Sequence, residues 1–242
     1  MISVLGIDPS LKSTGFCLLE NDKGNLKVAH IGNFETTRDN KSRTARIADI
    51  CFQVRLLFGH APMILALEGY SYNSDTSSLT DLAELSGCIK NTAFTSGMRL
   101  LTYPPLTVKS LCMGTELNGL KKTTIADRKI YLDLIRAKYP IFTYDGMVPD
   151  IGDAFLIAYT GMMELELKMK PALEFIQAVR SDKSKKMASL KKLMMNRLVD
   201  NGILSWSKKK KAFMYKKTEI KSLDQWTRFP TFCDFIHHFR IE

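Results

Sequence analysis

Four acidic residues stand where an acidic side chain is costly unless it has a function. Asp8 ends one apolar run, Glu68 ends another, and Asp150 and Asp153 open a late helical segment. Carboxylates gathered at the ends of hydrophobic strands need a cation, because burial and mutual repulsion both oppose their charge. Such oxygen ligands suit Mg²⁺ or Mn²⁺, and two ions roughly 4 Å apart could hydrolyse a phosphodiester. The sequence thus predicts a metal site at these four acids.

Each acid also has a simpler interpretation when it is taken alone. Asp8 could be a turn residue at a strand end, and Asp150 or Asp153 could cap a helix. Glu68 is harder to explain in this way, because it follows a wholly apolar run at residues 63–67. Zinc is disfavoured, because the four histidines show no ligand spacing with the acids.

Hydrophobic periodicity predicts an α/β fold, a mixed five-stranded sheet flanked by helices. The expected strands are Ile2–Asp8, Thr14–Glu20, Leu26–Thr36, Met63–Leu67 and Arg99–Tyr103, and the expected helices are Ser42–Phe58, Asp75–Gly97, Thr107–Met113, Thr123–Lys138 and Asp150 to about Lys168.

This order of elements brings the acids together. The first strand lies centrally, and the fourth runs parallel beside it after a helical crossover. Asp8 and Glu68 then share the carboxyl edge of the sheet. Asp150 and Asp153 are three residues apart and lie on one face of a helix, whose N-terminus favours negative charge. Pro149 suits the start of that helix.

Charge is distributed unevenly along the 242 residues. Residues 1–167 hold 17 Lys and Arg against 18 Asp and Glu, whereas residues 168–242 hold 18 against 7. The net charge of +10 therefore comes entirely from the C-terminal third. Such a block indicates an anionic partner, nucleic acid rather than a membrane. The alternative is a solvated helical face.

Other features narrow the class of protein. The five cysteines are scattered and form no CxxC pair, which argues against a disulfide framework or a structural zinc site. No apolar stretch approaches the roughly 20 residues that span a bilayer, and the N-terminus lacks the basic region of a secretory signal. We therefore expect a cytoplasmic protein with no membrane partner.

Four motifs in order resemble those of RuvC-type Holliday junction resolvases. They are Val4–Ser10 with Thr14–Phe16, Ala66–Glu68, Pro104–Lys109 and Pro149–Ala158. The resemblance covers residues 2–165 and implies an RNase H-like fold, a homodimer, and Mg²⁺-dependent paired symmetrical nicking of four-way DNA junctions. Such cleavage serves DNA recombination, repair or phage genome processing. On this resemblance Asp8, Glu68, Asp150 and Asp153 hold two ions per site, for which Mn²⁺ substitutes.

The resemblance also suggests residues that contact DNA. Lys122 matches a lysine near the scissile phosphate, with Lys121 a close competitor, and Lys109 matches a phosphate contact. Tyr70 or Tyr72 corresponds to an aromatic residue that wedges into the junction. Each could instead be an ordinary exposed lysine or loop tyrosine.

The chain departs from the bacterial pattern in three places. Ser10 replaces a glycine, Gly69 replaces a polar residue, and the tail has no counterpart. We therefore expect a phage or viral relative with a nuclease domain at 1–168 and a basic, mainly helical extension at 169–242. The extension binds DNA or supports the dimer, and its DNA-contact candidates are Lys208, Lys209, Lys210 and Lys211.

Three other functions compete with this prediction. The segment Gly6–Gly15 also resembles the first phosphate loop of actin-like and sugar-kinase ATPases, but the second, duplicated domain that those proteins need is not recognisable, so no nucleotide cofactor is expected. A branch or flap endonuclease with relaxed specificity is a closer rival. The third is a non-catalytic DNA-binding protein on an RNase H-like scaffold.

Overall fold

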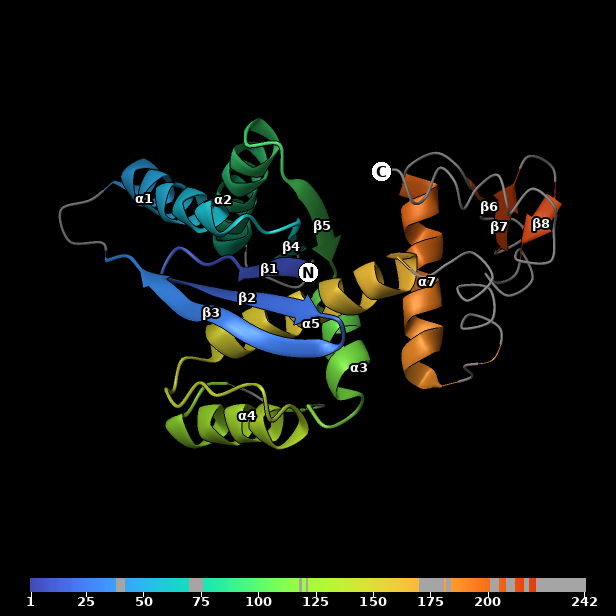
Figure 1. The fold of residues 1–242 in the computed structure, drawn as a ribbon. Coiled ribbons are helices and arrows are strands. Elements are labelled where there is room, and N and C mark those ends of the chain that lie inside the picture. The colour runs from blue at the N-terminus through green and yellow to red at the C-terminus, as the bar shows by residue number, and fades with distance from the viewer. Residues whose placement is uncertain are drawn as a thin grey trace. The chain divides into compact units, whose positions relative to one another are not determined.

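A computed structural model gives the fold of the chain (Figure 1). It divides into two compact units, Met1–Met162 and Met163–Glu242, which are described separately. The structure describes residues 1–37, 42–69, 76–117, 119–120, 122–169, 181, 184–200, 205–207, 212–215 and 218–220.

A five-stranded mixed sheet forms the centre of the first unit. Its strand order is β3-β2-β1-β4-β5. The first three strands form an antiparallel meander, and β4 and β5 join it in parallel with β1. The strands are β1 (Ile2–Asp8), β2 (Ser13–Asp22), β3 (Asn25–Glu35), β4 (Ile64–Glu68) and β5 (Arg99–Tyr103). The predicted mixed sheet is confirmed, and β1 lies at its middle.

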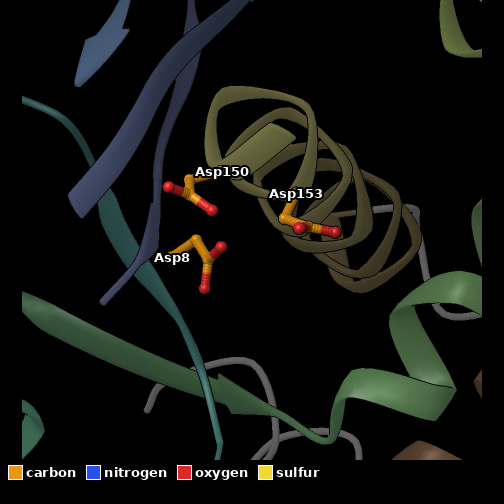
Figure 2. Close-up of side chains that lie close together, drawn as sticks. All are labelled: Asp8, Asp150 and Asp153. Carbon is orange, nitrogen blue, oxygen red and sulfur yellow. The ribbon is translucent and has the colours of Figure 1, made fainter. Parts of the chain in front are cut away.

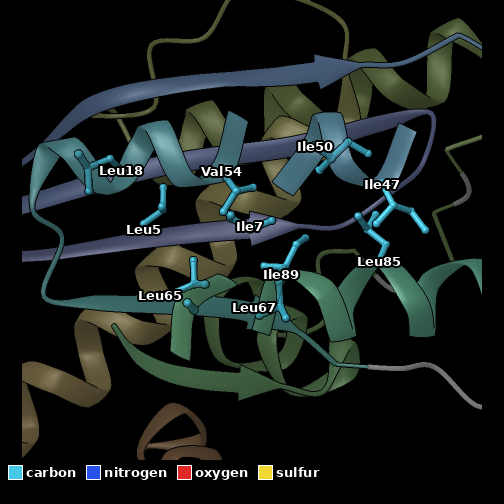
Figure 3. Close-up of a cluster of buried hydrophobic side chains, with 11 residues drawn as sticks. Leu5, Ile7, Leu18, Ile47, Ile50, Val54, Leu65, Leu67, Leu85 and Ile89 are labelled. Atoms are coloured by element: carbon cyan, nitrogen blue, oxygen red, sulfur yellow. The ribbon is translucent and has the colours of Figure 1, made fainter. Parts of the chain in front are cut away.

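Helices α1 (Arg43–Leu57) and α2 (Thr76–Thr95) cover one face of this sheet. Alternate residues of β1 and β4 point to that face. With the buried sides of the two helices they form the hydrophobic core shown in Figure 3, which comprises Leu5, Ile7, Leu18, Ile47, Ile50, Val54, Leu65, Leu67, Leu85, Ile89 and Ala93. The other residues of β1 and β4 therefore face the opposite side of the sheet.

The first part of α5 (Pro149–Met169) packs on that opposite side. Helices α3 (Pro105–Met113) and α4 (Ile125–Lys138) lie against α5. Cys112 of α3 contacts the backbone oxygen of Leu156, and the ring of Tyr139, which follows α4, meets the edge of Phe155 at 5.4 Å. The sheet is thus covered on both faces, as predicted.

Most boundaries differ from those predicted by one or two residues, and two of these differences have a reason in turn geometry. The residues between β2 and β3 reduce to the pair Lys23 and Gly24, both with positive φ, because such a two-residue turn matches the twist of a hairpin. Helix α3 starts at Pro105 rather than Thr107, since proline is well suited to the first helical position.

In the second unit the described residues include the end of α5, a further helix and a small sheet. Helix α7 (Lys185–Asp200) lies in the extension that was predicted to be mainly helical. The strands β6 (Ser205–Ser207), β7 (Ala212–Tyr215) and β8 (Thr218–Ile220) pair antiparallel in the order β6-β7-β8. The extension therefore contains strands that its lysine-rich sequence did not predict.

Candidate metal centre at the carboxyl edge of the sheet

Asp8 and Glu68 lie next to each other at the ends of β1 and β4. The parallel register pairs Gly6 with Ala66, two residues earlier in each strand. Because side chains alternate along a strand, Asp8 points to the same face as Gly6, and Glu68 to the same face as Ala66. Gly6 and Ala66 both face α5. The two carboxylates therefore point towards the helix rather than into the core beneath α1 and α2.

Two glycines allow α5 to reach this edge. A Cβ atom added at Gly6 would lie 2.3 Å from a backbone oxygen of α5, and one added at Gly15 would lie 2.2 Å from the carbonyl oxygen of Asp150. Only glycine permits such close backbone approach. The helix begins at Pro149, which puts Asp150 in its first turn and Asp153 one turn further on.

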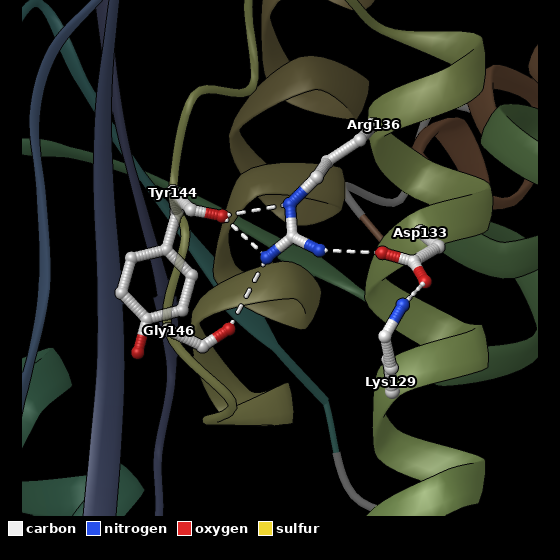
Figure 4. A network of polar contacts seen from close by, with 5 residues as sticks. All are labelled: Lys129, Asp133, Arg136, Tyr144 and Gly146. Carbon is white, nitrogen blue, oxygen red and sulfur yellow. Dashed lines mark hydrogen bonds and ion pairs between the residues drawn. The ribbon is translucent and has the colours of Figure 1, made fainter.

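The segment that leads into α5 is held by Arg136 of α4 (Figure 4). Its guanidinium donates to the carbonyl oxygen of Tyr144 through Nε at 2.9 Å and Nη2 at 2.6 Å, and to that of Gly146 at 3.2 Å. Nη1 donates to Asp133 at 2.7 Å. The planar fork of an arginine can bind neighbouring carbonyl groups in this way, which a lysine cannot. Arg136 thus fixes the turn that precedes Pro149.

The aspartates converge in the space between β1 and α5 (Figure 2). One carboxylate oxygen from each of Asp8, Asp150 and Asp153 lies within 4.8 Å of the others. Asp8 and Asp153 are buried, and Asp150 is half-buried. Glu68 adjoins this group through a side-chain hydrogen bond with Asp8. The structure therefore brings all four predicted acids together.

Burial and repulsion make these acids harder to ionise. Burial, then the charges of Glu68 and Asp153, raise the pKa of Asp8 well above its ordinary value. Burial also raises the pKa of Glu68, although the hydrogen bond from Asp8 opposes this. Burial raises the pKa of Asp150 despite a hydrogen bond with Ser13. Two carboxyl groups can share a hydrogen bond only if one carries a proton, so the cluster has too little positive charge around it.

Two lysines border the cluster. Lys122 forms an ion pair with Oδ2 of Asp153. Burial lowers the pKa of Lys122, but Asp153 and then Asp8 and Glu68 outweigh burial, and the pKa is raised overall. Lys109 of α3 lies close enough for its charge to lower the pKa of Glu68. Both predicted lysines therefore stand at the acidic edge.

Tyr131 of α4 is a part of the site that sequence reasoning missed. Its hydroxyl donates to Oδ1 of Asp153 at 2.6 Å, and Nζ of Lys122 lies 4.4 Å from the centroid of its ring. Burial, and next the charge of Asp153, raise the pKa of Tyr131 well above its ordinary value, so the hydroxyl keeps its proton and can donate it. Its only signal in the sequence is a tyrosine on the apolar stripe of a helix.

The donor set fits a divalent cation. Its members are hard oxygen ligands, which Mg²⁺ and Mn²⁺ prefer over nitrogen or sulfur. In the described part of the chain, the four carboxylates have Lys122 as their one direct ion-pair partner. A bound cation would remove both the repulsion among the acids and the need for a shared proton.

Several predicted DNA contacts lie outside the described residues. These are Lys121, Tyr70, Tyr72, Lys208, Lys209, Lys210 and Lys211. Their roles stay predictions. Within the described ranges, no helix has the length and apolar character needed to cross a bilayer.

Comparison with known proteins agrees with this geometry. The model of the family "Crossover junction endodeoxyribonuclease RuvC" matches residues 4–147. The chain belongs to the RuvC family. The predicted resemblance to RuvC-type enzymes is confirmed. The match includes Asp8 and Glu68 and ends just before Asp150, so it is the fold that adds the last two acids of the cluster to the RuvC region.

Individual RuvC proteins show the extent of the likeness. The RuvC of Syntrophomonas wolfei is 28% identical over 130 residues, which are 53% of this chain and 75% of that protein. The RuvC of a Chelativorans species is 26% identical over 159 residues, or 65% and 86% of the two chains.

A solved structure, Thermus thermophilus RuvC in complex with a Holliday junction substrate, superposes with a TM-score of 0.52 and 16% identity. It covers 67% of this chain and 96% of its own. This likeness confirms the predicted fold.

Proposed function

We propose that this protein is a structure-selective endodeoxyribonuclease that resolves four-way DNA junctions by paired symmetrical nicking. DNA recombination, repair or phage genome processing would supply such junctions. The observation that carries the proposal is the carboxylate cluster at the β1 and β4 edge of a RuvC fold, with Lys122 beside it. A purely structural domain would have no use for buried acids that repel one another and repel DNA.

We propose Mg²⁺ as the cofactor, with Mn²⁺ as a substitute and two ions per site. Asp8, Glu68, Asp150 and Asp153 would hold these ions. Bound there, they supply Lewis acidity, which lowers the pKa of a water molecule and stabilises negative charge on phosphate oxygens. No nucleotide cofactor is part of the proposal.

The remaining roles in cleavage belong to side chains of the protein itself. Burial and the charges of Glu68 and Asp153 favour a proton on Asp8, and Asp8 would have to give up that proton in order to hold a cation. Lys122 and Lys109 bring positive charge to the edge where a phosphate would approach. Charge that develops on the phosphate during cleavage is stabilised by an ammonium group already in position.

Paired nicking requires two copies of the chain. One carboxylate cluster cuts one strand, whereas a four-way junction is resolved by two symmetrical cuts. A homodimer with two-fold symmetry would place one cluster at each of two equivalent strands. We therefore propose a homodimer, which light scattering of the full chain in solution tests directly.

The basic extension is proposed to bind DNA arms or to support the dimer. Residues 168–242 carry a net charge of +11, and Lys208–Lys211 form the densest basic run. Lysines that bind phosphates release counterions, so this binding weakens steeply with salt. The slope of junction affinity against salt concentration, with and without residues 169–242, measures how many phosphate contacts the extension makes.

Metal-dependent cleavage of a panel of DNA substrates tests the function. With Mg²⁺, the full chain should nick a synthetic four-way junction at symmetrical positions on two strands and leave duplex and single strands intact. Equal cutting of flaps would instead indicate a branch endonuclease. Binding with no cleavage in Mg²⁺ or Mn²⁺ would indicate a non-catalytic DNA-binding protein.

A matched pair of variants links this cleavage to the cluster. Asp8→Asn should abolish cleavage and leave junction binding largely intact. Asp22→Asn changes an exposed aspartate at the end of β2 opposite to Gly15, outside the cluster, and should cleave like the native protein. Near-native cleavage by Asp8→Asn would refute the proposed metal site.

A further inference from the structure

We infer that Tyr131 is a positioning residue, which orients Asp153 as a metal ligand and places the ammonium of Lys122 beside it. The inference rests on the proposed function and names a residue that acts through these two partners rather than by touching DNA. It also accounts for a buried tyrosine hydroxyl at the acidic edge of the sheet.

The contacts around Asp153 form a closed arrangement of three side chains. Tyr131 donates to Oδ1 of Asp153 at 2.6 Å, and Lys122 pairs with Oδ2 of the same carboxylate. Nζ of Lys122 also lies 4.4 Å from the centroid of the Tyr131 ring, within the range of a cation–π contact. One tyrosine therefore holds the carboxylate with its hydroxyl and the lysine with its ring.

Burial makes these contacts strong and specific. Tyr131 is 1% exposed and Asp153 is 7% exposed. Water competes little for hydrogen bonds at such positions, and a charged acceptor strengthens them further. The carboxylate consequently keeps one orientation before any cation arrives, so a cation need not order it on binding.

The tyrosine itself is set by a rigid helix. Thr124 and Asp127 form a reciprocal capping box at the start of α4. Leu132 and Ile135 are fully buried on the side that faces α5. The Tyr131 hydroxyl is therefore placed by helix packing, whereas Lys122 lies in the segment before α4, and its ammonium is held between Asp153 and the Tyr131 ring.

Metal affinity, measured without DNA, tests this role. Tyr131→Phe keeps the ring and removes only the hydroxyl, and Mn²⁺ binding can be followed by calorimetry or electron paramagnetic resonance. Partners of metal ligands typically contribute about 10–100-fold to affinity. We expect Tyr131→Phe to weaken Mn²⁺ binding by that factor.

Tyr139→Phe is the matched control. Its hydroxyl donates to the backbone oxygen of Cys112 at 2.7 Å and contacts no carboxylate of the cluster. It should lose stability and keep native Mn²⁺ affinity. If Tyr131→Phe also kept native Mn²⁺ affinity, the positioning role would be overturned.

A double-mutant cycle with Asp153→Asn shows through which partner Tyr131 acts. If the tyrosine works through Asp153, Tyr131→Phe should weaken Mn²⁺ binding no further in the Asp153→Asn background. An equal fractional loss in both backgrounds would overturn the inference. Native Mn²⁺ affinity in Tyr131→Phe would overturn the positioning role and leave the nuclease proposal untouched. A native protein that cuts no junction would refute the nuclease proposal, and the Mn²⁺ affinities would still test the positioning role.

Discussion

Replacing Lys122 with methionine tests whether this lysine stands in for a metal ion before one binds. The variant keeps a side chain of similar length and removes the ammonium that neutralises Asp153. In the metal-free protein this leaves a buried carboxylate without its cation. On the proposed function, a bound Mg²⁺ would neutralise the same carboxylate. We therefore expect Lys122→Met to destabilise the metal-free protein far more than the Mg²⁺-bound one.

The size of the effect follows from the exposure of the pair. Removing one partner of a buried ion pair costs about 3–5 kcal/mol. The Lys122 side chain keeps 25% of its surface exposed and Asp153 10%, so solvent screening reduces the expected loss to about 2–3 kcal/mol. For a protein of this size, 1 kcal/mol lowers the melting temperature by roughly 2–4 °C. The variant should thus melt roughly 4–12 °C lower without Mg²⁺.

Thermal unfolding with and without saturating Mg²⁺ measures this difference. Lys129→Met is the control, because Lys129 pairs with Asp133 at the surface of α4, away from the cluster. That variant should melt close to the native protein in both conditions. An equal drop for Lys122→Met with and without Mg²⁺ would refute the idea that the lysine and the ion neutralise the same carboxylate.

Three further predictions concern the elements that build the site. The raised pKa of Asp8 means that the folded metal-free protein holds a proton which the unfolded chain releases, so stability should fall as pH rises from the ordinary carboxyl range through the raised pKa, and Mg²⁺ should abolish this fall. Gly15→Ala should displace α5 from β2 and weaken both thermal stability and Mn²⁺ affinity. Arg136→Lys should lower the free energy of unfolding by about 1–2 kcal/mol, as measured by urea titration, because its fork to two carbonyl groups is lost.

Each of these has its own control. The pH dependence should also diminish in Asp8→Asn, and an unchanged slope in that variant would assign it to another group. Gly59→Ala adds a methyl group where no atom lies within 4 Å, so it should leave Mn²⁺ affinity native. An Arg136→Lys variant with native stability would show that the turn before α5 holds without the guanidinium.

Alternation along the strands explains why so much of the site was predictable. Asp8 and Glu68 each end a strand whose preceding residues are apolar, so their edge and their parallel pairing followed from the order of the elements. Asp150 and Asp153 followed from helical spacing after Pro149. Such patterns depend only on residues that are near one another in the sequence, so they can be recognised before the fold is known.

Contacts between different helices and strands left no comparable pattern in the sequence from which they could be predicted. Tyr131 lies on the apolar stripe of α4. At such a position the sequence does not distinguish a tyrosine that only packs in the core from one whose hydroxyl donates to a carboxylate. Gly6 and Gly15 belong to recognisable motifs, but their need for close approach becomes clear only once α5 is seen to cross those strands. Arg136 was not singled out, because its partners are backbone oxygens, which every residue carries.

The placement of the last acids on α5 also has a consequence for biosynthesis. Asp150 follows Asp8 by 142 residues. A ribosome that adds roughly 5–20 residues per second makes β1 and β4 well before α5. The emerging sheet can form with Asp8 and Glu68 at its edge, yet it lacks the helix that completes the carboxylate cluster. On the proposed function, a growing chain would therefore gain its nuclease centre only after α5 has left the ribosome and docked.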